Sequence, residues 1–112
     1  MREKKFKLSA DQIEKLIEPM GSCVASDKIT VDGFFVGYMY REESNFSADS
    51  GWRFFSGTEE QEYVDNPDNL MFYDLNTIAN YDPAIIPYLP LGVGSELERG
   101  NNNTFRIIKT GE

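Results

Sequence analysis

Histidine is absent from this 112-residue chain, and cysteine occurs once, at Cys23. Histidine is the commonest general base near neutral pH and the commonest metal ligand, so its absence excludes Ser–His and Cys–His catalytic pairs. Zinc sites built from cysteine and histidine are excluded in the same way. A single cysteine cannot form an internal disulfide. We therefore expect Cys23 to be a small buried apolar residue in a protein of the reducing cytoplasm.

Long apolar segments are also missing. No apolar run approaches the roughly 20 residues needed to cross a bilayer, and the basic N-terminus is not followed by the apolar stretch of a signal peptide. The formal net charge is -8 and the pI is about 4.5, so the chain repels phosphate backbones and anionic lipids. We expect no nucleic acid partner and no membrane binding. The acidity favours a basic protein partner, and it equally fits a plain role in solubility.

The usual motifs for calcium, phosphate and nucleophilic chemistry are absent as well. The acidic string 65–69 does not have the spacing of oxygen ligands and glycine that a calcium loop needs, and turn-forming residues explain it. The segment 92–95 lacks the lysine of a phosphate-binding loop. Carboxylates such as Glu59, Glu60 and Glu62 fit an exposed helix face. We expect no enzymatic activity, no metal and no cofactor.

The N-terminal region predicts a basic arm followed by a helix. Residues 1–8 carry four basic side chains. Ser9 and Gln12 have the spacing of a capping box, and apolar residues then recur with helical spacing. We therefore predict a helix over 10–18, which proline and glycine end.

After this helix the pattern is that of strands. A short apolar strand over 23–25 precedes the β-branched residues 29–31, and Asp32 with Gly33 forms a turn dipeptide. We predict a hairpin of 29–31 and 34–41 around this turn. Both faces of 34–41 are apolar, which is typical of a central strand.

The second half alternates short strands and short helices. The pattern predicts a strand over 52–55, helices over 59–64 and 75–80, a short helix starting at Pro83, and a last strand over 104–109. Together the elements predict an α+β fold with a mostly antiparallel sheet, an N-terminal helix and short helices after the Trp52–Phe55 strand. We expect one domain over residues 1–112.

The segment 51–83 is the strongest candidate for a binding site. It concentrates the only tryptophan with other aromatics, carboxylates and asparagines. Aromatic rings beside uncompensated carboxylates suit the centre and rim of an interface with a basic protein, while a plain core would explain part of the set. The candidate binding residues are Trp52, Arg53, Tyr63, Asp65, Asp68, Tyr73, Asp74, Asn76, Tyr81 and Asp82.

Several long motifs resemble one bacterial family. They are Val24–Thr30, Val36–Glu42, Asp49–Gly57, Glu62–Asn69 and Tyr73–Leu89. Over about residues 22–99 the chain resembles the immunity protein 33 family, first described as domain of unknown function 2185. Its members are predicted immunity proteins of polymorphic-toxin systems. The resemblance implies a small cytoplasmic protein that neutralises a cognate toxin, and it brings no catalytic residues with it.

Two functional hypotheses follow. In the first, the chain is a non-enzymatic immunity protein that binds a basic toxin domain through an acidic, aromatic surface. In the second, it is a stand-alone housekeeping domain with a small-molecule pocket near Trp52, Tyr73 and Tyr81. The sequence does not distinguish a monomer from a homodimer.

Overall fold

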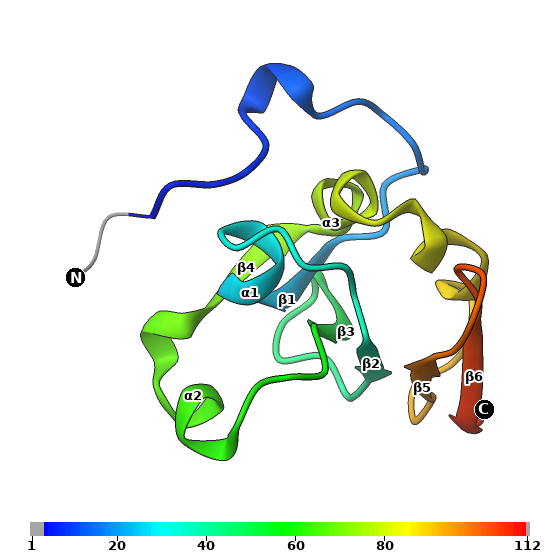
Figure 1. The fold of residues 1–112 in the computed structure, drawn as a ribbon. Coiled ribbons are helices and arrows are strands. Elements are labelled where there is room, and N and C mark those ends of the chain that lie inside the picture. The colour runs from blue at the N-terminus through cyan, green and yellow to red at the C-terminus, as the bar shows by residue number, and fades with distance from the viewer. Residues whose placement is uncertain (1–3, 112) are drawn as a thin grey trace.

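The centre of the fold is a six-stranded sheet, seen in a computed structural model that describes residues 4–111 (Figure 1). The strand order is β4-β1-β3-β2-β5-β6. In the described residues β1 and β3 run parallel, and the other neighbouring pairs are antiparallel. The strands are β1 (Ser22–Ser26), β2 (Tyr38–Arg41), β3 (Asp49–Phe55), β4 (Leu70–Asp74), β5 (Glu96–Arg99) and β6 (Phe105–Lys109).

Short helices complete the domain, and the α+β prediction is confirmed. The helices are α1 (Asp27–Thr30), α2 (Gln61–Asp65) and α3 (Leu75–Tyr81), with 3-10 turns η1 (Ala10–Gln12), η2 (Pro67–Asn69) and η3 (Pro83–Tyr88). Helices α1 and α3 and the turn η3 contribute Ile29, Leu75, Ile78 and Ile85 to the core, so they cover one face of the sheet (Figure 1). The helices predicted over 59–64 and 75–80 are α2 and α3. The predicted final strand is β6.

Strand β3 runs through the middle of the core. All seven of its residues are buried. Trp52 and Phe54 point to the helices with their rings stacked at 6.1 Å, and the Trp52 indole N–H donates to the Leu89 carbonyl at 3.1 Å. The predicted strand at Trp52–Phe55 is confirmed, and it begins earlier, at Asp49.

The hairpin predicted over 29–31 and 34–41 is wrong. Residues Asp27–Thr30 form helix α1, because the Ser26 hydroxyl caps it by accepting the Lys28 N–H and the Ile29 side chain is fully buried in the core. The tertiary burial of Ile29 thus outweighs its β-branched preference. Only Tyr38–Arg41 of the second segment is a strand, β2, and its central place is confirmed since it lies between β3 and β5.

The helix predicted over 10–18 is also wrong beyond its first turn. The capping box forms, with the Ser9 N–H donating to Gln12 Oε1 at 2.8 Å, but the turn η1 ends at Gln12. The chain after it passes along α3, where Asn76 and Asn80 lie one turn apart and bond its backbone. Asn80 Oδ1 accepts the Glu14 N–H at 3.0 Å, and Asn76 Oδ1 accepts N–H groups further along. These bonds replace the helical ones.

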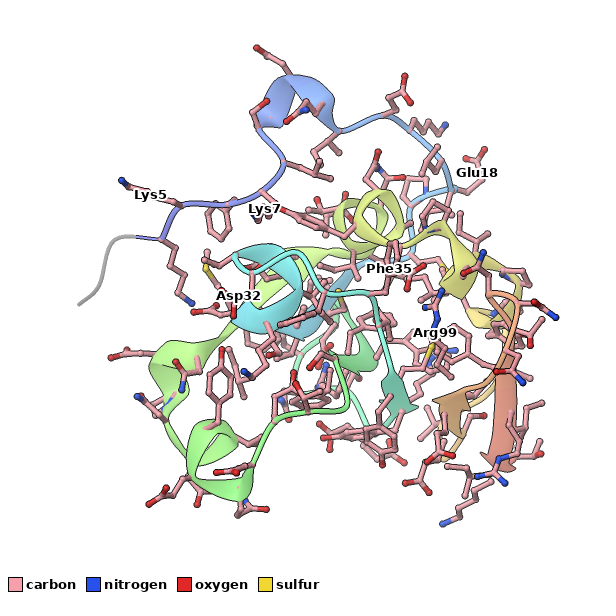
Figure 2. The ribbon with its side chains drawn as sticks, in the orientation of Figure 1. Lys5, Lys7, Glu18, Asp32, Phe35 and Arg99 are labelled. Atoms are coloured by element: carbon pink, nitrogen blue, oxygen red, sulfur yellow. The ribbon has the colours of Figure 1, made fainter. Side chains whose placement is uncertain are left out.

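Part of the predicted basic arm lies in the described residues and contacts the domain. The Lys4 ammonium pairs with Asp27 at 2.8 Å, and the Lys7 N–H donates to the Thr30 carbonyl at 2.8 Å. Lys7 lies beside the turn that carries Asp32, whereas Lys5 points away from the domain (Figure 2). Residues 1–3 of the predicted arm lie outside the described residues.

Candidate functional site

The strands β2, β3 and β5 present two different faces. Met39, Trp52, Phe54 and Leu97 point into the core and are fully buried. Their neighbours point to the opposite side, because successive side chains of a strand alternate. The strand registers place Tyr40 opposite Arg53 and Glu96, and Tyr38 opposite Phe55 and Glu98. We call this second set the second face; it consists of Tyr38, Tyr40, Arg53, Phe55, Glu96 and Glu98.

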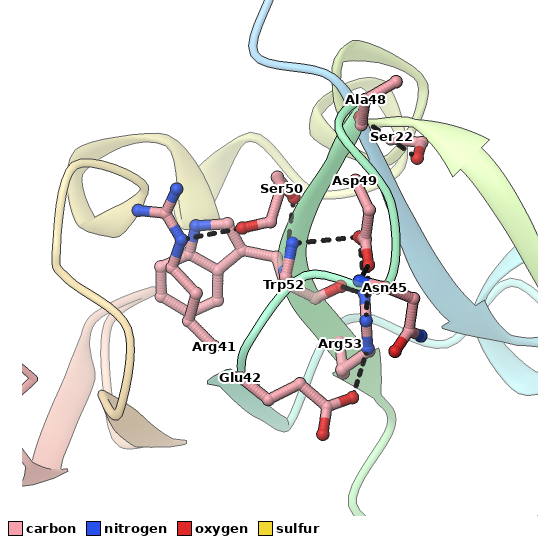
Figure 3. A network of polar contacts seen from close by, with 10 residues as sticks. Ser22, Arg41, Glu42, Asn45, Ala48, Asp49, Ser50, Trp52 and Arg53 are labelled. Atoms are coloured by element: carbon pink, nitrogen blue, oxygen red, sulfur yellow. Dashed lines mark hydrogen bonds and ion pairs between the residues drawn. The ribbon is translucent and has the colours of Figure 1, made fainter.

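An ion-pair cluster lies at the centre of the second face (Figure 3). The Arg53 guanidinium donates to both Asp49 oxygens, at 2.9 and 2.8 Å, and its Nε donates to Glu42 at 2.6 Å. Asp49 also accepts the Asn45 and Gly51 N–H groups at 2.9 Å. Arg53 holds the pKa of the Asp49 carboxyl well below its usual range. Arg53 is only 4% exposed. Its buried ion pair with Asp49 stabilises the loop before β3.

Three aromatic rings lie beside this cluster. Tyr40 and Phe55 have their ring planes 6° apart with centroids at 6.1 Å, and Tyr38 contacts both rings at 5.8 and 6.4 Å. The Tyr38 hydroxyl donates to Glu96 Oε2. Burial, with the Glu96 hydrogen bond, raises the pKa of Tyr38, and burial beside Glu42 raises that of Tyr40. Both phenols are therefore neutral donors at physiological pH. We call Tyr38, Tyr40 and Phe55 the aromatic triad.

Two hollows flank the tyrosines of the triad. The first, of about 280 Å³, is named the Lys109 hollow; it is lined by Tyr38, Tyr40, Arg41, Glu42, Val93, Gly94, Ser95, Glu96 and Lys109. The second, of about 230 Å³, is named the Glu59 hollow; it is lined by Tyr38, Tyr40, Phe55, Gly57, Glu59 and Val64. Tyr38 and Tyr40 thus line both hollows, and Phe55 lines only the second.

Glu59 is fixed at the wall of its hollow. Its two carboxylate oxygens accept the Ser56 and Gly57 N–H groups at 2.8 and 3.0 Å. Burial acts to raise the pKa of Glu59, but hydrogen bonds from the Ser56 backbone and from the Ser26 side chain, among others, outweigh it and the pKa is lowered. Glu59 is therefore an anion at neutral pH, at the wall of the hollow.

Three of the predicted site residues are buried. Trp52 is fully buried in the core, and Arg53 forms the ion-pair cluster described above. Asp82, 2% exposed, pairs with Arg99 at 2.6 Å and accepts the Val36 N–H at 2.9 Å. Figure 2 labels Arg99 beside Phe35, and its guanidinium lies 5.2 Å from that ring. The structure brings Asp82 and Arg53 to separate clusters.

Three others fasten the N-terminal segment. Tyr73 contacts the Phe6 ring edge-on at 6.0 Å, and burial raises its pKa to about 12. The Tyr81 hydroxyl accepts the Leu8 N–H at 3.1 Å. Asn76 bonds the backbone after η1, as described above. Asn76 and Tyr81 belong to α3 and Tyr73 to β4, so none of the three is on the second face.

The remaining four are more exposed and scattered. Tyr63 on α2 lies under the Lys28 ammonium, 5.0 Å from its ring centroid. Asp65 accepts a hydrogen bond from Gln61 at 2.8 Å, while Asp68 lies in η2. Asp74 occupies the cap position of α3 without a side-chain cap bond. The ten predicted residues therefore do not form one site.

The candidate site includes residues that the sequence-based set omitted. Tyr38, Tyr40 and Phe55 belong to the strands that the sequence does predict, and alternation alone could have placed them on one side. What sequence could not supply is the pairing of β2 between β3 and β5. That pairing brings Glu96, more than fifty residues along the chain, to Tyr38.

Residues 23–109 match the Immunity protein Imm33 domain. The chain belongs to the Imm33 family of immunity proteins. The match begins at the second residue of β1 and reaches the end of β6, so it spans all six strands apart from Ser22 and leaves the segment before residue 23 outside. The predicted family resemblance is therefore confirmed, and the final strand, which the motifs over 22–99 leave out, belongs to the match.

Comparisons with curated proteins and with solved structures find no match. Within residues 4–111 no helix has the length and apolar character to cross a membrane. The same residues contain no group of three or more histidine, cysteine or acidic side chains arranged to hold a metal ion. Family membership and the second face are thus the two observations from which a function can be argued.

Proposed function

We propose that this Imm33 protein neutralises a cognate toxin by binding it with the second face, without a catalytic step. The observation that carries the proposal is the aromatic triad, whose Tyr38 and Tyr40 line two hollows on the face that the core helices leave free. Membership of the family supports the immunity role. The geometry of the second face supports its use as the binding surface.

The composition of this face fits a protein interface. Tyrosine rings are common in the energetic centres of interfaces because they contribute a large contact area with a polar tip. Here Tyr38 and Tyr40 are half-buried, so they are already ordered before binding. Ordered side chains lose less conformational entropy on association.

We propose that carboxylates around the face help to select the partner. Glu42, Glu59 and Glu96 line the two hollows, and Glu98 lies opposite Tyr38. The whole chain carries a net charge of -8. These charges favour a toxin with a basic surface, both in approach and in the final fit. We propose that this encounter takes place in the cytoplasm, where the single Cys23 stays reduced.

The test is co-expression with the toxin encoded next to this gene. The wild-type chain should rescue growth and co-purify with the toxin. Tyr40→Ser should lose both properties while keeping a wild-type circular dichroism spectrum. Phe34→Ser is the matched control, since Phe34 is an aromatic that is 53% exposed and lies outside the second face. Full rescue by Tyr40→Ser would refute the proposed surface.

The alternative of a small-molecule pocket near Trp52, Tyr73 and Tyr81 has less support. Trp52 is sealed in the core, and the two tyrosines bind the N-terminal segment. The geometry therefore favours the protein-binding function.

A further inference from the structure

We infer that the Glu59 hollow receives one arginine side chain of the partner protein. This inference rests on the proposed function and names the chemistry of its central contact. It is argued from the size, the walls and the charge of the hollow.

The size suits a single side chain. At about 230 Å³ the hollow is smaller than the roughly 300–1,000 Å³ of typical small-molecule sites. It is open at the surface beside the triad, so a side chain projecting from a docked protein can reach it. A whole ligand would leave most of its own surface in water.

The walls suit a planar cation. Tyr40 and Phe55 have nearly parallel ring planes, 6° apart, and the Tyr38 ring is tilted against both by 44° and 38°. Aromatic faces attract cations through their quadrupole. A guanidinium is flat, weakly hydrated and able to stack on a ring, so arginine uses such a wall better than lysine.

The charge distinguishes this hollow from its neighbour. The Lys109 hollow shares Tyr38 and Tyr40, but two basic residues of this chain, Arg41 and Lys109, are among the residues that line it. None of the described residues lining the Glu59 hollow is basic, and Glu59 contributes an ionised carboxylate. The Glu59 carboxylate accepts hydrogen bonds from the Ser56 and Gly57 N–H groups, but no cation is among the described residues that line the hollow with it.

The experiment titrates the isotope-labelled full chain with Nα-acetyl-arginine methylamide and follows backbone amide shifts by NMR. The neutral citrulline analogue serves as the control because it has nearly the same shape and no charge. We expect saturable shifts confined to residues 38–40, 55–59 and 64, with arginine only. No saturable shift at these residues, or equal shifts with citrulline, would overturn the inference.

Two variants test the hollow in different ways. Glu59→Gln removes the anion, and Val64→Lys adds an internal cation while leaving the turn at Glu59 intact. Each should weaken arginine binding about tenfold, the scale of a partly desolvated cation contact. Glu62→Gln, the matched control, removes an equal charge from α2 outside the hollow and should bind as wild type. Wild-type affinity in both Glu59→Gln and Val64→Lys would also overturn the inference.

Toxin binding by the same proteins separates this inference from the proposed function. If the arginine probe fails to bind but the toxin binds and Tyr40→Ser abolishes that binding, the inference falls and the proposed function stands. If the probe binds in the hollow but the toxin does not bind the chain, the proposed function falls and no partner arginine reaches the hollow.

Discussion

The two faces of β3 carry side chains of different chemistry and different burial. Trp52 and Phe54 lie in a closed apolar core. The residues that follow each of them point to the opposite side, where Arg53 belongs to the ion-pair cluster and Phe55 to the aromatic triad. The first face excludes water completely, and the second is only partly covered. Core packing is concentrated on one side of the strand, and we propose that the other side serves recognition.

The largest effect is expected on the core face. Trp52→Ala removes a fully buried ring and its indole hydrogen bond to Leu89, so we expect a loss of roughly 3–5 kcal/mol in the free energy of unfolding. Urea denaturation followed by circular dichroism measures it. A loss of under about 1 kcal/mol would contradict the assignment of stability to this face.

A variant of the ion-pair cluster tests whether buried residues of the second face also contribute to the free energy of unfolding. Asp49→Asn weakens the bidentate contact with Arg53 and leaves a buried guanidinium only partly paired, with Glu42 as its remaining anion. Breaking a buried pair costs up to about 3–5 kcal/mol, and the retained amide oxygen should reduce this to about 2 kcal/mol. Glu98→Gln, which affects an exposed pair with Arg106, is the control and should cost under about 1 kcal/mol.

The same variant should change the pH dependence of stability. The pKa of Asp49 is lowered in the folded chain, so folding is favoured above the unfolded pKa of about 3.9 and this contribution is lost as the pH falls below it. Wild type should lose more stability than Asp49→Asn between pH 5 and pH 2. Parallel pH profiles of the two proteins would show that the contact contributes no such linkage.

A smaller effect on stability but a large effect on binding is expected at the triad. Tyr40→Ser truncates a half-buried ring, so the free energy of unfolding should fall by about 1 kcal/mol. Toxin affinity should fall by about 2 kcal/mol or more, as at other aromatic anchors. Calorimetry and titration on one preparation give both values. If Tyr40→Ser lowered the free energy of unfolding by more than the free energy of toxin binding, the proposed difference between the two faces would be wrong.

The smallest effect is expected from charges beyond the rim. Glu60→Gln with Glu62→Gln should slow toxin association a few-fold at low salt and reduce its salt dependence, with little change in dissociation. Stopped-flow kinetics at two ionic strengths measure this. Asp11→Asn with Glu18→Gln, on the N-terminal segment, is the matched control. An unchanged rate for the first pair would exclude steering by α2.

Local sequence patterns predicted correctly those helices and strands whose pattern is strong or whose contacts lie nearby in the sequence. The alternation at Trp52–Phe55 and the cap residue Asp74 before 75–80 gave β3 and α3 correctly. The helix over 10–18 failed because Asn76 and Asn80, some sixty residues away, bond its backbone. The hairpin at Asp32 failed because the cap at Ser26 and the burial of Ile29 favour a helix.

The candidate site depended even more on distant contacts. The sequence identified Arg53 and the acidic, aromatic character of the chain, but it grouped residues by their proximity along 51–83. The fold instead separates Asp82 from Arg53 and brings Tyr38 to Glu96. Pairing between strands far apart in the chain cannot be inferred from a local pattern, which is why the surface emerged only from the structure.

Because the single tryptophan is buried in the core, its fluorescence reports selectively on the core. Trp52 is fully buried, and its indole N–H is bonded to a backbone carbonyl. Its emission should be blue-shifted in the folded chain and move to longer wavelength only when the core opens to water. A tryptophan-free partner docking on the opposite side of β3 would leave that signal nearly constant. Fluorescence can therefore report the integrity of the fold while a complex is being formed, without a label.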